Sequence, residues 1–218
     1  MTKTFSGLLI ISLLLASCSI RYNPEAIPVL RDLIFGAKDI RIDSKYFTNE
    51  DASFAKIKFG RSYIVIPNLT SVDNGIAKWE SPSNEIIHTN NGKIISIIGF
   101  NYDASISGFK SLKFNQVENS KREFSINLSN PDGFFTQTSN FSFKQLDDIY
   151  HLADVKKTTH LYLENVTTNG FKWKMKNKYW VDPQTGLVLK TEQTVHPGLP
   201  EITIYFYYKF NRDKKNPG

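Results

Sequence analysis

The stretch GFKWKMKNKYWVDPQTGLVLKTEQ, residues 170–193, predicts two β-strands joined by a tight turn. Its side chains alternate in character, as expected of strands with one buried face. Within the turn, Pro183 presets φ and Gly186 supplies a left-handed position. The alternation places Phe171, Trp173, Met175, Tyr179 and Val181 on one face and Lys172, Lys174, Lys176 and Lys178 on the other. We therefore expect an antiparallel hairpin with a buried aromatic face.

The same pattern extends along most of the chain. Asn74-Gly75 and Asn91-Gly92 are dipeptides that supply the positive φ of tight hairpins. Sixteen Phe and ten Tyr favour a β-rich interior. Further strands are expected within 54–67, 72–81, 85–100, 121–129, 134–143, 159–167, 186–196 and 201–210. Many short strands with regular turns predict a mainly β protein built on a large, curved antiparallel sheet, as a sandwich or partial barrel.

Few segments depart from this pattern. A short N-terminal helix is expected over 23–36, because Asn23 can cap it, Pro24 suits its first turn and Gly36 can end it. We expect residues 37–53 to be irregular with one candidate strand at 40–42, residues 101–119 to be a loop, and residues 145–151 to be a candidate short helix that Asp147-Asp148 would cap. Residues 211–218 are expected to form a flexible basic tail.

The first 17 residues have the layout of a secretory signal. Lys3 is followed by an apolar run over 5–16 and by the small residues Ala16 and Ser17. A membrane-spanning helix needs about 20 apolar residues, so this run is too short to be one. We predict a signal peptide at 1–17, cut between Ser17 and Cys18.

Cys18 is the only cysteine of the chain. Leu15-Ala16-Ser17-Cys18 resembles the lipobox of bacterial lipoproteins, in which this thiol receives a diacylglyceryl group and the new N-terminus an acyl group. Two or more acyl chains hold a protein stably at a membrane, whereas one does so only marginally. The alternative is an ordinary signal peptide with a coincidental cysteine. The expected organisation is a lipidated tether at 18–23 followed by a single β-rich domain at 24–210.

Two internal runs, WKMKNKYWVDPQTGLVLKTEQ (173–193) and IAKWESPSNEIIHTNNGKIISIIG (76–99), together with the lipobox, resemble the YjbF/GfcB family of bacterial lipoproteins. The resemblance implies an outer-membrane lipoprotein that assists polysaccharide secretion or surface assembly. It also implies a curved antiparallel sheet similar to that of the periplasmic lipoprotein carriers. Ser19 after the cysteine is similar to the default signal for outer-membrane delivery. The family brings no known active site to this chain.

The residues themselves argue for no chemistry. Removal of the signal segment, which contains Lys3, lowers the net charge from +6 to +5. This basic excess is mild, and no nucleic-acid-binding module accompanies it, so we do not expect nucleic acid as a partner. The four histidines are scattered without metal-ligand spacing, so we expect no metal site. They are His88, His151, His160 and His196. No nucleophile elbow, Walker loop or dinucleotide fingerprint occurs.

Two surfaces remain as candidates for binding. The lysine face, Lys172, Lys174, Lys176 and Lys178, could meet an acidic polymer or lipid phosphates, although edge-protecting lysines of a solvated sheet give the same pattern. The strand at 201–210 has aromatic residues on both faces, which indicates core packing, or else a groove for a sugar or an acyl chain.

We therefore predict a non-enzymatic lipoprotein, anchored in the outer membrane and facing the periplasm. It would support exopolysaccharide or capsule export through contacts with other export proteins, with no cofactor beyond its own acyl groups. The alternative is a lipid-binding module that holds an acyl chain in the concave face of its sheet. A polysaccharide-modifying enzyme would need clustered acids in a cleft.

Overall fold

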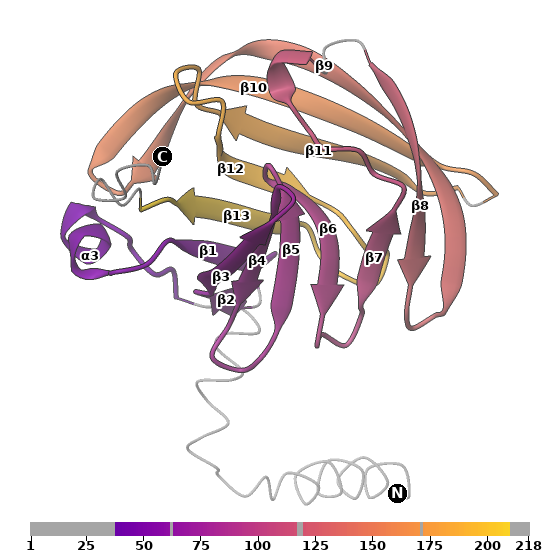
Figure 1. Ribbon diagram of the computed structural model, residues 1–218, viewed down its shortest axis with the longest axis horizontal. Helices are drawn as coiled ribbons and strands as arrows, with labels where there is room; N and C mark the ends of the chain where they lie inside the picture. The colour runs from indigo at the N-terminus through magenta and orange to yellow at the C-terminus, as the bar shows by residue number, and fades with distance from the viewer. Residues whose placement is uncertain (1–37, 62, 117–119, 171, 210–218) are drawn as a thin grey trace, which may run out of the picture. The chain divides into compact units, whose positions relative to one another are not determined.

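A computed structural model describes residues 38–61, 63–116, 120–170 and 172–209. Its thirteen strands form one antiparallel sheet in which nearly every strand lies beside its neighbour in sequence (Figure 1). The last strand also pairs with the first, so the sheet closes on itself, with twelve strands in the ring and β2 outside it. The expected mainly β, antiparallel fold is confirmed. The expected partial barrel is wrong, because the sheet is closed.

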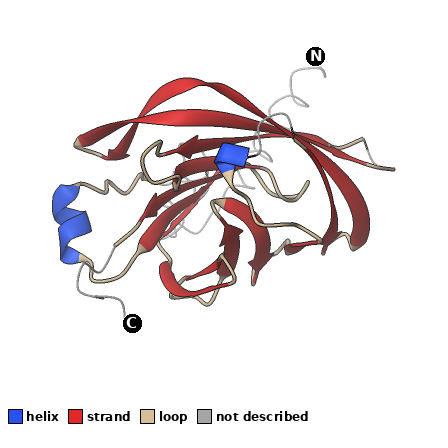
Figure 2. Cartoon of the chain, turned by 45° about the horizontal axis from the view of Figure 1, so that its top comes forward, coloured by secondary structure: helices blue, strands red, loops and turns tan. Residues whose placement is uncertain are grey.

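Strands fill most of the described chain, and the two helical segments in that part are short (Figure 2). In chain order the elements are α3 (Ser44–Asn49), β1 (Phe54–Phe59), β2 (Tyr63–Val65), β3 (Asn68–Asp73), β4 (Ile76–Glu80), β5 (Ile86–Asn90), β6 (Lys93–Ile98), β7 (Ala104–Ser107), the 3-10 helix η1 (Phe114–Gln116), β8 (Lys121–Leu128), β9 (Gly133–Leu152), β10 (Val155–Thr168), β11 (Lys174–Val181), β12 (Val188–Gln193) and β13 (Ile202–Tyr207).

The pairing of β1 with β13 closes the ring. It runs over six residue pairs, from Phe54 opposite Tyr207 to Phe59 opposite Ile202. Closure removes the free edges that an open sheet of this size would expose. Turn residues such as Asn-Gly indicate pairing only between strands that follow one another in sequence. They therefore do not predict pairing between the first and the last strand of the domain.

Alternate residues of most strands fill the interior of the barrel. In β8, Phe124, Ile126 and Leu128 are buried, as the alternation of this segment predicts. In β13, the inward residues Ile202, Ile204 and Phe206 are fully buried. Large aromatic side chains of other strands, Trp79 and Tyr179 among them, pack in the same core. The barrel is therefore filled by its own side chains.

The hairpin of β9 and β10 is far longer than the others, at 20 and 14 residues. Residues 145–159 of this hairpin, which we call the flap, fold over the outer side of the barrel. Ile149 packs there with Trp180 and Leu189, whose neighbours Tyr179 and Val188 point inward. The expected helix at 145–151 is wrong, because residues 145–150 pair with β10, and strand pairing overrides the weak local helix signal.

The segment expected to be a loop at 101–119 contains β7 and η1. Residues 108–116, which we call the plug loop, carry Leu112 and Phe114 into the core. Asn90 Oδ1 accepts from the Leu112 amide at 2.7 Å, and Asn91 Nδ2 donates to the Leu112 carbonyl at 3.3 Å. The β5–β6 turn thus holds the plug loop in place.

Helix α3 covers the outer side of β1 and β13. Asp43 caps it by accepting from the Tyr46 amide at 2.8 Å. Phe47 packs against Phe54 and Tyr207, with ring centroids 6.3 and 6.5 Å apart. The aromatic residues on both faces of β13 therefore pack in cores. Of the two alternatives for this strand, core packing or a ligand groove, the structure supports core packing. The candidate strand at 40–42 is wrong, since these residues are irregular.

Several predictions fall on residues that the structure does not describe. The signal peptide at 1–17, Cys18, the tether at 18–23, the helix at 23–36 and the tail at 211–218 lie outside the described residues. They remain predictions from the sequence.

Candidate functional site

A buried ion pair crosses the interior of the barrel. Lys93 of β6 donates to both carboxylate oxygens of Glu164 of β10, at 2.7 and 2.9 Å. The side chains are 3% and 0% exposed. The strands are not neighbours in the sheet, so this contact ties two walls of the barrel together.

Further hydrogen bonds complete the shell around Glu164. Tyr179 donates its hydroxyl to Glu164 at 2.6 Å, and Asn177 donates its amide at 2.8 Å. Burial, with the nearby Glu164 charge, raises the pKa of Tyr179 well above its usual value, so the hydroxyl keeps the proton it donates. A buried carboxylate is tolerated only with such compensation. Because every partner is itself buried, this cluster, Lys93, Glu164, Asn177 and Tyr179, is a structural element that solvent does not reach.

A pocket opens at the end of the barrel where the plug loop enters. Its volume is about 520 Å³, within the range of about 300–1,000 Å³ usual for small-molecule sites. We call it the mouth pocket. It is lined by Asn91, Lys113, Phe114, His160, Tyr162, Val181 and residues 182–186. These side chains come from the β5–β6 turn, the plug loop, β10 and the β11–β12 turn, which are distant in sequence.

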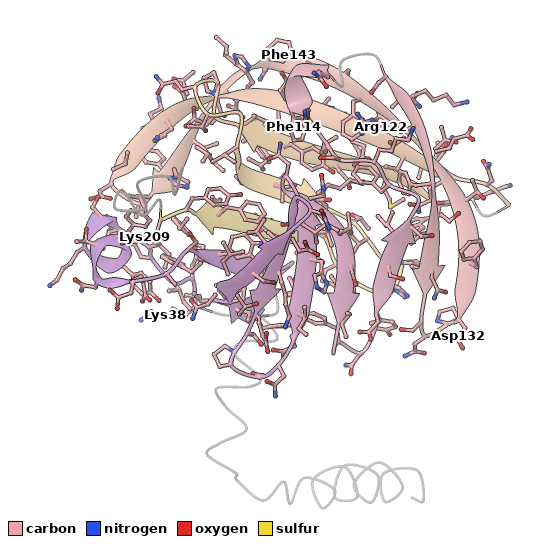
Figure 3. The ribbon with its side chains drawn as sticks, viewed as in Figure 1. Lys38, Phe114, Arg122, Asp132, Phe143 and Lys209 are labelled. Atoms are coloured by element: carbon pink, nitrogen blue, oxygen red, sulfur yellow. The ribbon has the colours of Figure 1, made fainter. Side chains whose placement is uncertain are left out.

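Aromatic rings form one wall of the mouth pocket. Tyr162 contacts two phenylalanines: Phe114, which also lines the pocket, at a ring-centroid distance of 5.1 Å, and Phe143, which lies outside the lining, at 5.5 Å. Phe143 also contacts the His160 ring edge-on at 5.4 Å. Both Phe114 and Phe143 are labelled in the upper part of Figure 3. Phe143 is 38% exposed, so this wall continues from the core to the surface.

Polar groups form the opposite rim. Asp182 Oδ1 accepts from the Gln184 amide at 2.8 Å and so fixes the predicted turn, while Oδ2 lies 3.8 Å from Lys157 Nζ. Asn91 donates its amide nitrogen to the carbonyls of Leu112 and Gly186. Its Oδ1 is buried and has no hydrogen-bond partner among the described residues. The opposite (flipped) orientation of the Asn91 side-chain amide is excluded, since its oxygen would then face two carbonyl oxygens.

Comparison with known proteins decides the family. Residues 28–206 match the family described as "Group 4 capsule polysaccharide lipoprotein gfcB, YjbF". The chain belongs to the YjbF family. A curated member, the "Uncharacterized lipoprotein GfcB" of Escherichia coli (strain K12), is 23% identical over 204 residues, covering 90% of this chain and 94% of GfcB. The sequence resemblance to this family is thereby confirmed.

The fold of this YjbF-family chain also has a counterpart among solved structures. The crystal structure of the hypothetical lipoprotein YmcC from Escherichia coli (K12) aligns with a TM-score of 0.68 at 19% identity. The alignment covers 83% of this chain and 94% of YmcC. The likeness shows a shared fold. Within the part of the chain that the structure describes, no helix is long and apolar enough to cross a bilayer.

The lysine face lies on the outside of the barrel, opposite the buried Met175 and Tyr179. Lys172, Lys174 and Lys176 are exposed. Lys178 is half-buried and donates to Glu192 at 2.7 Å, and this hydrogen bond raises the pKa of Lys178. The hairpin and its alternation are as predicted, whereas binding of an anionic ligand by this face remains a prediction, as does lipidation at Cys18.

The structure separates the four histidines of this YjbF-family chain. His151 Nε2 donates to the Phe206 carbonyl at 2.6 Å, and His196 Nε2 lies 2.8 Å from the Ser129 carbonyl. Only His160 lines the mouth pocket. Across the described residues, no three side chains of His, Cys, Asp or Glu are grouped as a metal site would need.

Sequence reasoning missed the ion pair and the mouth pocket. A signal for Glu164 was present, because it shares the inward face of its strand with Tyr162 and Val166, where a charge is out of place. Asn91 was assigned to a hairpin turn, which it forms with a φ of 41°. Nothing in the sequence shows that this turn meets the plug loop and the Asp182 turn.

Proposed function

We propose that this chain is an outer-membrane lipoprotein that faces the periplasm and assists capsule or exopolysaccharide secretion or assembly. It acts through contacts with other export proteins and performs no chemistry of its own. The observation that carries the proposal is the match of residues 28–206 to a family described as a capsule polysaccharide lipoprotein.

The membrane anchor in this proposal is Cys18. The signal layout and the lipobox motif at Leu15–Cys18 support acylation of this thiol. Acylation at the thiol and at the new N-terminus gives the two or more chains that stable anchoring requires. Membership of a lipoprotein family supports the same reading.

The buried ion pair and the mouth pocket also support a non-enzymatic role. Lys93 and Glu164 are buried against each other in the core, where a substrate cannot reach them. The mouth pocket holds a single carboxylate, Asp182, which is bound into its own turn. Paired carboxylates across a cleft, the arrangement that glycoside hydrolysis uses, are not formed by the residues lining that pocket.

No observation favours the alternative of an acyl chain bound in the concave face of the sheet. That face is the interior of the barrel, and Trp79, Tyr179 and Phe206 fill it at 0–1% exposure. A chain of methylene groups would have to displace these rings at the cost of a close-packed core.

The test is surface polysaccharide in a strain that lacks this protein. The strain is complemented with the wild-type gene or with Cys18→Ala, and both proteins are quantified so that expression is matched. We expect polymer to fall on deletion and only the wild type to restore it. Unchanged polymer after deletion would refute the role in export. Full restoration by Cys18→Ala would refute the requirement for the anchor.

A further inference from the structure

The mouth pocket is a formed cavity that the proposed function does not use. Its floor is rigid, because Phe114 is buried in the core and the β5–β6 turn holds the plug loop through Leu112. Its rim is fixed by the hydrogen bond from the Gln184 amide to Asp182. A cavity bounded by three anchored segments is preorganised for a ligand.

The aromatic wall suits a flat ligand with an apolar face. Tyr162 lies between Phe114 and Phe143, and His160 stands edge-on to Phe143. His160 lines the pocket and is partly exposed, so its ring is accessible, and the neighbouring Phe143 is exposed as well. The C–H groups on one face of a sugar ring pack on such rings, since that face is apolar and the aromatic faces carry partial negative charge.

The polar groups of the rim include donors and acceptors. Lys113 offers an ammonium, Asp182 a carboxylate oxygen, and Gln184 an amide with both functions. Within the described part of the chain, the His160 ring nitrogens make no hydrogen bond, and Asn91 Oδ1 is a buried acceptor without a partner.

This combination excludes simpler ligands. A phosphate has few or no donors and would face the Asp182 carboxylate. An acyl chain would leave the polar rim unpaired, which is unfavourable. A saccharide has hydroxyls that both donate and accept around a ring with an apolar face, and it matches both walls at once.

We propose that the mouth pocket binds a saccharide unit of a surface glycan, with the ring stacked on Tyr162 and His160, whose positions Phe143 supports, and its hydroxyls bonded to Asp182, Gln184 and Lys113. The identity of the glycan as the secreted polymer rests on the proposed function, whereas the site itself rests on the geometry of the pocket.

The experiment is calorimetric titration of the full mature chain, residues 18–218, in detergent. The probes are oligosaccharides prepared by partial hydrolysis of the producing strain's surface polysaccharide, with dextran fragments of equal size for comparison. We expect saturable binding by the wild type. Phe143→Ala and His160→Ala should each weaken it at least tenfold, and Gln184→Ala should weaken it by a smaller factor.

The matched control is Phe134→Ala, because Phe134 is an exposed phenylalanine of the same strand, β9, whereas Phe143 contacts the lining rings of His160 and Tyr162. Thermal unfolding of each variant checks that it is folded. Absence of binding by the folded wild type to either set of fragments, or equal binding by folded wild type, Phe143→Ala and His160→Ala, would overturn the site.

The two proposals fail separately. If deletion of the gene lowers surface polysaccharide but the protein binds no fragment, the export role stands and the saccharide site is refuted. If the protein binds fragments through the pocket but deletion leaves the polymer unchanged, the site stands and the export role is refuted.

Discussion

Lys93 Nζ lies 2.7 Å from Glu164 Oε1 in the centre of the barrel, with both side chains buried. Strands β6 and β10, which carry them, are separated in the sheet by β7, β8 and β9. The pair therefore acts across the lumen rather than along the sheet, and it sets the distance between two walls.

Removing one partner of this pair should be strongly destabilising. Glu164→Gln or Lys93→Met leaves an uncompensated buried charge, and we expect a loss of about 3–5 kcal/mol in the free energy of unfolding. The double variant Lys93→Met/Glu164→Gln should regain much of this loss, because no charge remains buried and the Gln oxygen can still accept from Tyr179 and Asn177. Urea titration measures all three. The exposed pair Lys121–Glu123 is the control, and Lys121→Met there should cost less than about 1 kcal/mol. Additive losses in the double variant would contradict the account.

Gly92 should tolerate no side chain. Its φ is +79°, and a Cβ there would lie 2.6 Å from the Val188 side chain. We expect Gly92→Ala to cost about 2–4 kcal/mol, from backbone strain and from overpacking. Gly108 has a similar φ of +74° with nothing within 4 Å of its Cβ position, so Gly108→Ala isolates the backbone cost of about 1–2 kcal/mol. Equal losses in the two variants, measured by thermal and urea unfolding, would show that Val188 is not the obstacle.

The flap should open independently of the barrel. It is held by Ile149 packing on Trp180 and by hydrogen bonds from Trp180 Nε1 to Asp147 at 2.7 Å and from His151 Nε2 to the Phe206 carbonyl at 2.6 Å. Ile149→Ala should speed amide exchange in residues 145–159, while exchange in β13 stays slow. Leu146→Ala is the control, because Leu146 is an exposed apolar residue of the same segment. If exchange in β13 rises equally, the flap is part of the global folding unit.

Stability should fall as pH is lowered from about 7.5 to 5.5. Burial lowers the pKa of His196 below its usual value of about 6.5, and its Nδ1 accepts from the Gly198 amide at 2.9 Å, so the folded state holds the neutral ring. A histidine with a lowered folded pKa contributes its stability above the unfolded pKa and loses it as pH falls towards the folded one. Unfolding titrations across this range should show a shallower slope in His196→Phe than in wild type. Identical slopes would exclude His196 as the cause.

Several elements were predictable because their signals are local. The alternation of 170–193 and of 121–129 gave the correct inward faces, and Asn74-Gly75 and Asn91-Gly92 form the hairpin turns expected of them, with positive φ at all four residues. The segment at 145–151 was missed, because its strand state depends on pairing with β10 and on cover from Trp180. Local propensity carries no information about such partners.

The site was less predictable than the fold for the same reason. The mouth pocket combines Asn91, Phe114, His160 and Asp182, which come from four segments that meet only when the ring closes. Glu164 alone carried a sequence signal, as a charge on an apolar face. Its partner Lys93 opens a strand after a turn, where a lysine is unremarkable in sequence and its burial depends on the fold.

The pairing of β1 with β13 also fixes when folding can finish. Ile57 pairs with Ile204, so the contact that completes the ring joins residues near opposite ends of the domain. Contacts of such long sequence separation form late and slowly. A nascent chain that has not yet delivered its C-terminal strand must keep two unpaired edges, on β1 and β12, exposed to other chains. A protein sent across a membrane in extended form would therefore need those edges shielded until its last strand arrives.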